Sequence, residues 1–295
     1  MRKIKELFIE KSLLLSALIT IAVTIGIIAV LSIEAFNFFK EVSIIDFITD
    51  TEWMPLAKDK AYQHFGILPL LAGTFLTSII AIAVALPIGL SISIYLSEYA
   101  PSKFRKTIKP LLELLAAVPT VVYGFFALVV VTPFLQQYIP DLSSFNSLSA
   151  GIVMGIMIIP YVSSISEDAL HAVPNKLREA SFGMGATKLQ TAFKVAVPAA
   201  SSGIIVSVIL AISRAIGETM IVAVAAGQQP RLTLDPTVPI ETITAYIVQV
   251  SLGDVQHGSV EYRTIYAAGI TLFLFTFLLN TISYRIRKKF QSRYE

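Results

Sequence analysis

The chain has 295 residues, of which 55% are hydrophobic and only 15% are charged. This composition excludes a disordered chain and argues strongly against a soluble globular domain. The formal net charge is +3 and cysteine is absent, which excludes disulfides, thiol catalysis and cysteine metal sites.

Long runs without a charged residue indicate membrane-spanning helices, each of which needs about 20 apolar residues. Six spans are predicted in chain order, at about residues 12–33, 71–97, 111–133, 147–168, 199–226 and 264–284. The first run is longer than a signal-peptide core of roughly 7–15 residues, so we expect it to be retained. The sequence therefore predicts an all-α integral membrane protein, with residues 1–295 as one transmembrane domain.

The distribution of basic residues orients these spans. Seventeen of the 23 Lys and Arg residues lie in segments 1–11, 98–110, 167–198 and 285–295. Only five lie in the intervening segments 34–70, 133–147 and 227–263. By the positive-inside rule, both termini are predicted to be cytoplasmic and the segments 34–70 and 227–263 to lie outside.

Each long outer segment carries a structural expectation. Trp53, the single tryptophan, is expected to anchor segment 34–70 at the membrane interface. In segment 227–263, the helical spacing of apolar residues over Thr242–Leu252 predicts a helix that lies on the outer surface.

Prolines interrupt two predicted spans. Pro119 in the third span and Pro160 in the fourth are each expected to kink a helix, because proline lacks the backbone N–H donor. Such breaks commonly serve packing, but non-helical backbone is also tolerated where it lines a cavity. Pro119 and Pro160 are therefore candidate hinges, and Tyr123, just after Pro119, is a candidate for a substrate pathway.

Two charges, Arg214 and Glu218, lie inside the fifth predicted span. On insertion scales, a charge at the centre of a span costs ~2.5–3.5 kcal/mol. Their i,i+4 spacing predicts one helix face, where the two can pair. One interpretation is a self-neutralising pair that fastens the helix to its neighbours. The other is a guanidinium that binds an oxyanion in a wet cavity, a geometry that suits arginine.

The segment between the fourth and fifth spans has a defined pattern. Residues 175–184 predict a short polar helix, Gly185 a left-handed turn, and Thr187–Val197 an amphipathic run that ends at Pro198. One interpretation is a linker that packs against the ends of the spans. The other is a helix that inserts into a groove on a partner.

The spacing Glu179-Ala-Ser, three residues, Gly185, nine residues, Val195-Ala-Val-Pro resembles the EAA loop of ABC importer permeases. The stretches 73–78, 117–124 and 213–220 are similar to the phosphate-specific transport (Pst) permeases, and 51–55 with 65–69 to their C-type subunit. The resemblance covers about residues 12–284. It implies a type I importer permease fold, a coupling role for Glu179, Ala180 and Gly185 in the loop at about 170–198, and a link of Arg214 and Glu218 to phosphate movement.

The resemblance also implies partners. These are a sister A-type permease, two ATP-binding subunits that carry ATP and Mg, an extracytoplasmic phosphate-binding protein, inorganic phosphate and membrane lipid. In the chain itself we expect no enzyme activity, cofactor, metal or nucleic-acid site; the sequence contains no GxxxxGK[ST] phosphate loop. Alternatives are a permease for molybdate, sulfate or phosphonate, a non-transporting membrane scaffold, and a passive anion channel.

Overall fold

The computed structural model describes residues 2–291, and over this range the chain is helical without a β-strand. Four helices are long and apolar enough to cross a membrane unaided, counting α3 with the turn that continues it. They are α1 (Arg2–Phe39), α3 (Leu68–Ile94) with η2 (Tyr95–Tyr99), α7 (Ser147–His171) and α14 (Val260–Gln291). Two bent helix pairs supply up to two further crossings.

The first bent pair is α4 (Ser102–Ala117) followed by α5 (Thr120–Phe126), η3 (Ala127–Val131) and α6 (Thr132–Gln136). The second is α9 (Lys188–Thr191), η4 (Ala192–Ala196) and α10 (Val197–Ala199) followed by α11 (Ser201–Ile216). The remaining elements are short: α2 (Ile44–Thr49), η1 (Lys60–Tyr62), α8 (Asn175–Gly183), α12 (Met220–Ala225) and α13 (Ile243–Leu252).

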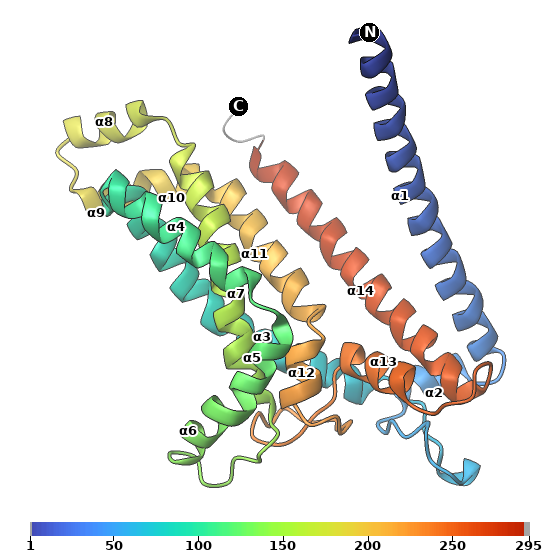
Figure 1. Cartoon of the computed structure of the whole chain (residues 1–295). Helices are drawn as coiled ribbons and strands as arrows, with labels where there is room; N and C mark the ends of the chain where they lie inside the picture. Colours follow the sequence, from blue (N-terminus) through green and yellow to red (C-terminus); the bar gives the residue numbers. More distant parts are fainter. Residues whose placement is uncertain (1, 292–295) are drawn as a thin grey trace.

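The helices run between two opposite sides of the molecule (Figure 1). We call the side that holds the start of α1, the end of α14 and helix α8 the terminal side. We call the other the loop side; it holds α2, α6 and α13. This alternation agrees with six crossings.

The centre of the fold is the pair α3 and α7, which pack closely along most of their length. Glycine permits this approach, because a Cβ at Gly151 would lie 2.7 Å from the side chain of Ile80, and one at Gly155 would lie 2.7 Å from that of Val84. Small residues let helix backbones come together in a membrane, where packing rather than the hydrophobic effect drives association. Helices α5, α11 and α12 complete this core around α7.

The third predicted span has the wrong form. Instead of one helix over 111–133, the chain turns by 85° between α4 and α5, and α5 begins at Thr120, directly after Pro119. The break expected at Pro119 is thus confirmed. Helix α4 also begins earlier than the charge-free run, because Arg105 and Lys109 are paired with acidic residues of α7.

The fourth span is not broken at Pro160, and a kink or hinge there stays a prediction. Helix α7 runs without a break from Ser147 to His171, with Pro160 buried inside it. A proline removes a single donor from the ladder. Close packing of α7 against α3, α4 and α11 holds the helix together on several sides.

Both expectations for the outer segments are also corrected. Trp53 is only 2% exposed, and it lies in a second apolar cluster with Phe38, Phe47 and Tyr246 rather than at a membrane interface. The helix over Thr242–Leu252 exists as α13, but its first four residues are buried. It packs against α14, α12 and α3, because its apolar residues cover the ends of these helices on the loop side.

Candidate functional site

The fifth predicted span is divided just where its two charges lie. Helix α11 ends at Ile216, and α12 begins at Met220. Arg214 is therefore in the last turn of α11, while Glu218 lies in the connection. The expected i,i+4 ion pair is wrong: the helix does not continue, and among the described side chains Arg214 has no carboxylate partner.

Arg214 instead contacts soft groups on α7. Its guanidinium carbon lies 4.6 Å from the ring centroid of Tyr161, and Nη2 donates to the sulfur of Met157 at 3.7 Å. Met157 and Tyr161 are four residues apart, so they lie on one face of α7. The Nε–H of Arg214 is enclosed without a hydrogen-bond partner. A partly buried guanidinium with unused donors is suited to receive an oxyanion.

Glu218 hydrogen-bonds to the backbone instead of pairing with Arg214, and its place in a substrate pathway stays a prediction. Its Oε1 accepts the backbone N–H groups of Met220 at 3.2 Å and Ile221 at 3.4 Å, at the start of α12. Its backbone carbonyl accepts the hydroxyl of Thr244 in α13 at 2.7 Å. The carboxylate is 7% exposed. Glu218 thus stabilises the break after Arg214 and connects it to the loop side.

Tyr123 stabilises the other break. Its hydroxyl donates to the carbonyl of Leu115 at 2.7 Å, which joins α5 to the last turn of α4 across Pro119. The side chain is 9% exposed and belongs to the central core. The adjacent Gly124 lies against α12, where a Cβ would approach Val224 to 2.9 Å. Tyr123 therefore fastens the break at Pro119, the adjacent Gly124 brings α5 against α12, and the place of Tyr123 in a substrate pathway stays a prediction.

Helix α8 stands at the edge of the terminal side and has no buried residue (Figure 1). Glu179 and Ala180 are exposed. So are the large apolar side chains of Leu177, Phe182 and Met184, with Met184 at 89%. The helix is followed by Gly185 at φ +83°, in the left-handed region expected for it. Apolar exposure on a short, defined helix indicates a surface for protein contact.

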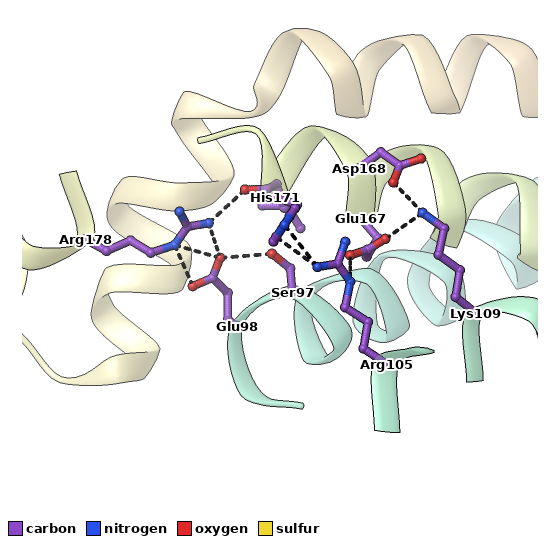
Figure 2. A network of polar contacts seen from close by, with 9 residues as sticks. Ser97, Glu98, Arg105, Lys109, Glu167, Asp168, His171 and Arg178 are labelled. Atoms are coloured by element: carbon purple, nitrogen blue, oxygen red, sulfur yellow. Dashed lines mark hydrogen bonds and ion pairs between the residues drawn. The ribbon is translucent and has the colours of Figure 1, made fainter. Parts of the chain in front are cut away.

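Arg178 fastens α8 to the central helices (Figure 2). Arg178 donates to Glu98 in η2, from Nη2 to Oε1 at 2.7 Å and from Nε to Oε2 at 3.1 Å. The same guanidinium donates to the carbonyls of Leu170 and Val173 at the end of α7. The Glu98 side chain is only 6% exposed. Arg178 therefore connects α8 to the ends of both central helices.

The other half of the network joins α4 to α7 (Figure 2). Glu167 is fully buried, and its two oxygens lie 2.5 Å from Nε of Arg105 and 3.0 Å from Nζ of Lys109. Lys109 also pairs with Asp168, and Nη1 of Arg105 lies 3.0 Å from Nδ1 of His171. Breaking either ion pair would leave a buried charge without its partner, which is costly. The two pairs therefore hold α4 against α7.

Sequence reasoning missed this network. Arg105, Lys109 and Arg178 entered only as positive charges on one side of the membrane. The available signal was position: Glu98 and Glu167 close the second and fourth apolar runs on the side rich in Lys and Arg. Opposite charges at helix ends on one side favour pairing, but the partners depend on which helices are neighbours.

Arg178→Gln should loosen α8 without unfolding the spans. The change leaves the carboxylate of Glu98 buried and unpaired, a loss of about 3–5 kcal/mol. Amide hydrogen exchange of residues 175–183 should therefore accelerate at least tenfold, while exchange in α3 stays slow. Lys176→Gln, an exposed position on the same helix, is the matched control. Equal exchange in the two variants would contradict the anchoring role of Arg178.

The sequence profile of the family described as "Binding-protein-dependent transport system inner membrane component" matches residues 85–295 of this chain. The chain belongs to this family. A relative described as a probable ABC transporter permease protein YqgH from Bacillus subtilis is 36% identical, with 89% of this chain and 84% of the relative covered. The phosphate transport system permease protein PstC of Mesorhizobium japonicum is 34% identical, covering 80% and 76%.

Solved structures agree on the fold. A bacterial alginate ABC transporter, in complex with a periplasmic protein that holds an alginate pentasaccharide, aligns with a TM-score of 0.60 at 18% identity. The alignment covers 95% of this chain and 97% of that one. The chain is thus a multi-pass plasma-membrane permease with the type I importer fold, and its relatives are permease subunits rather than enzymes. The resemblance to Pst permeases is confirmed.

Proposed function

We propose that this chain is one membrane subunit of an ATP-driven importer that moves inorganic phosphate into the cytoplasm. The observation that carries the proposal is Arg214, a guanidinium inside the transmembrane core with unused donors and no carboxylate partner among the described side chains. Relatives named as phosphate permeases support the identity of the anion.

Arg214 would act as a transient site rather than a tight one. The face of Tyr161 and the sulfur of Met157 orient the guanidinium but compete weakly for its donors, which remain available to phosphate oxygens. A pathway site must also release its ion. The neighbouring Glu218 accepts N–H groups at the start of α12 and so does not occupy the guanidinium of Arg214.

The proposal assigns partners to both sides of the molecule. ATP and Mg would be held by two separate ATP-binding subunits that contact the exposed face of α8 around Glu179, Ala180 and Gly185. Arg178 and Glu98 would pass movement of α8 to α7 and α3. A sister A-type permease would complete the pathway, and a binding protein would deliver phosphate at the loop side. The terminal side would face the cytoplasm, as the distribution of Lys and Arg indicates.

Uptake by the reconstituted complex tests the choice of anion. Proteoliposomes that contain the complex and its binding protein should accumulate labelled phosphate only with ATP inside. Unlabelled phosphate should compete, whereas sulfate, molybdate and phosphonate at equal concentration should not. Competition by one of these three would assign the chain to another oxyanion. Flux without ATP would indicate a passive channel, and no flux at all a scaffold.

A further inference from the structure

A pocket opens on the loop side, between the segment that follows α2 and the segment that precedes α13. Its volume is about 290 Å³, and its lining includes the largely buried residues Trp53 and Tyr246, whose ring centroids lie 5.0 Å apart in an edge-to-face arrangement. The exposed side chains of Met54 and Leu56 lie on one wall. Among the described lining residues, Glu241 alone carries a formal charge.

Glu241 is an incomplete ion site. The residue is 2% exposed, and Oε1 is enclosed without a hydrogen-bond partner. Burial raises the pKa of this carboxyl to about 8. Its backbone is fixed, since a Cβ at Gly73 of α3 would lie 2.1 Å from the Glu241 carbonyl oxygen. A buried carboxyl without a partner costs free energy, so its presence in a pocket points to a ligand.

Gln228, another lining residue, lies in a tight turn. Gly227 has φ +107°, and Gln228 has φ 49°, a left-handed conformation that glutamine rarely adopts. The Gln228 amide donates to the carbonyl of Ala223 at 2.9 Å, which holds the turn in place. Backbone strain of this kind persists where surrounding contacts enforce it, and it gathers at ligand clamps. The pocket is therefore preformed rather than closed by a flexible loop.

The segments on the loop side carry more acidic than basic residues. Segments 34–70, 133–147 and 227–263 together contain 11 Asp and Glu against 5 Lys and Arg. An acidic surface steers a partner whose facing surface is basic. A pocket with aromatic walls and a carboxyl floor suits an ammonium or guanidinium group, through cation–π contact and charge pairing.

We propose that this pocket receives one lysine or arginine side chain of the extracytoplasmic binding protein and anchors that protein on the loop side. The inference rests on the proposed function, because it requires a delivery protein. The alkyl stem of the side chain would lie between Trp53 and Met54, and its charged head would pair with Glu241. The acidic residues on the loop side would attract the basic anchor and repel free anions. Phosphate would therefore enter from the binding protein rather than directly from solution.

The pH dependence has a definite sign. The carboxyl is mainly protonated at pH 7, and an arriving cation favours its ionised form, so docking releases a proton. Docking should tighten about fivefold from pH 7 to pH 8 and level off above that. Tyr246 lines the pocket too, but burial raises its pKa and keeps it neutral. The hydrogen bond to Asp50 raises the pKa of His64 in segment 34–70, so His64 could also contribute to the pH dependence. A variant of Glu241 is therefore needed to assign the pH dependence to that residue.

A probe of the full chain tests the pocket directly. Trp53 is the single tryptophan, so in lipid nanodiscs its fluorescence reports on the pocket. Titration with n-butylammonium, a mimic of the lysine side chain, should give a saturable change that tightens up to pH 8. Glu241→Gln should abolish it, whereas Glu52→Gln, which changes the exposed carboxylate next to Trp53, should leave it. An equal response to uncharged n-butanol would overturn the proposal.

Docking of the binding protein on the complete transporter supplies the second measurement. Glu241→Gln should raise its Kd by about 30-fold or more and remove the pH dependence. Glu52→Gln should change the Kd less than threefold. If wild-type transporter imports phosphate but Glu241→Gln docks normally, the anchor is refuted and the importer stands. If docking weakens above pH 8, the protonated carboxyl of Glu241 donates a hydrogen bond to an anion, and the cationic anchor is refuted. If wild type imports nothing, the proposed function itself fails.

Discussion

Arg214→Gln is expected to abolish phosphate uptake while the complex still assembles. Glutamine keeps two hydrogen-bonding groups but loses the charge and the fork that match two phosphate oxygens. Hydrogen bonds to charged groups contribute about 1.5–3 kcal/mol each, so loss of two lowers transport at least 100-fold. Labelled phosphate uptake into proteoliposomes measures the effect.

The thermal stability of Arg214→Gln distinguishes a role of Arg214 in anion binding from a role in holding the fold together. The Nε–H of Arg214 has no hydrogen-bond partner, and its other contacts are a sulfur and a ring face. A charge held this loosely costs more desolvation than its contacts return. The thermal midpoint of Arg214→Gln should therefore equal or exceed that of wild type. Arg231→Gln, which changes an exposed residue of the 227–263 segment, is the control for both assays. Normal uptake by Arg214→Gln would refute the site.

Arg214→Lys divides the effect of charge from that of geometry. Lysine keeps the positive charge but presents a compact ammonium on a flexible stem rather than a planar fork. If the site needs only positive charge, uptake by Arg214→Lys should approach that of wild type. We expect instead an intermediate rate, at least tenfold below wild type, because Tyr161 orients a planar group by stacking.

The fold was largely predictable because hydropathy and charge act locally. A span needs about 20 apolar residues in lipid, so the runs around residues 71–97 and 147–168 identify α3 and α7. What failed was the continuity of helices. Pro119 ends a helix and Pro160 does not, although both follow apolar residues. The difference is tertiary: α7 is surrounded by helices, whereas Tyr123 fastens the turn beside Pro119.

The candidate site was predictable in its residues but not in its contacts. Arg214 stands out in the sequence because it is a charged residue in an apolar run. Burying a charge in lipid is costly whichever helices surround it, so the fold is not needed to single it out. The hydrogen-bond and ion-pair partners of Arg214 do depend on the fold, and the end of α11 at Ile216 separates Arg214 from Glu218. Glu241 shows the converse. It lies in a segment of ordinary polar composition, so only the fold reveals that its carboxyl is buried.

Gly185→Pro is expected to uncouple ATP hydrolysis from transport. Proline fixes φ near −65°, whereas Gly185 has φ +83°, so the turn after α8 must change direction. Uptake should fall at least tenfold, while ATP hydrolysis loses its stimulation by the loaded binding protein. Gly183→Ala is the matched control, because Gly183 lies within α8 at an ordinary φ with open space around it.

A second variant distinguishes altered geometry from altered contact. Ala180→Trp adds bulk to the exposed face of α8 without disturbing its backbone, so it should weaken binding of the ATP-binding subunits themselves. Arg178 lies on the inward face, so α8 should remain anchored in this variant. Loss of subunits in Ala180→Trp, together with retention but uncoupling in Gly185→Pro, would show that α8 both binds and transmits force. Subunits that stay bound and fully coupled in both variants would mean that this segment is not the coupler.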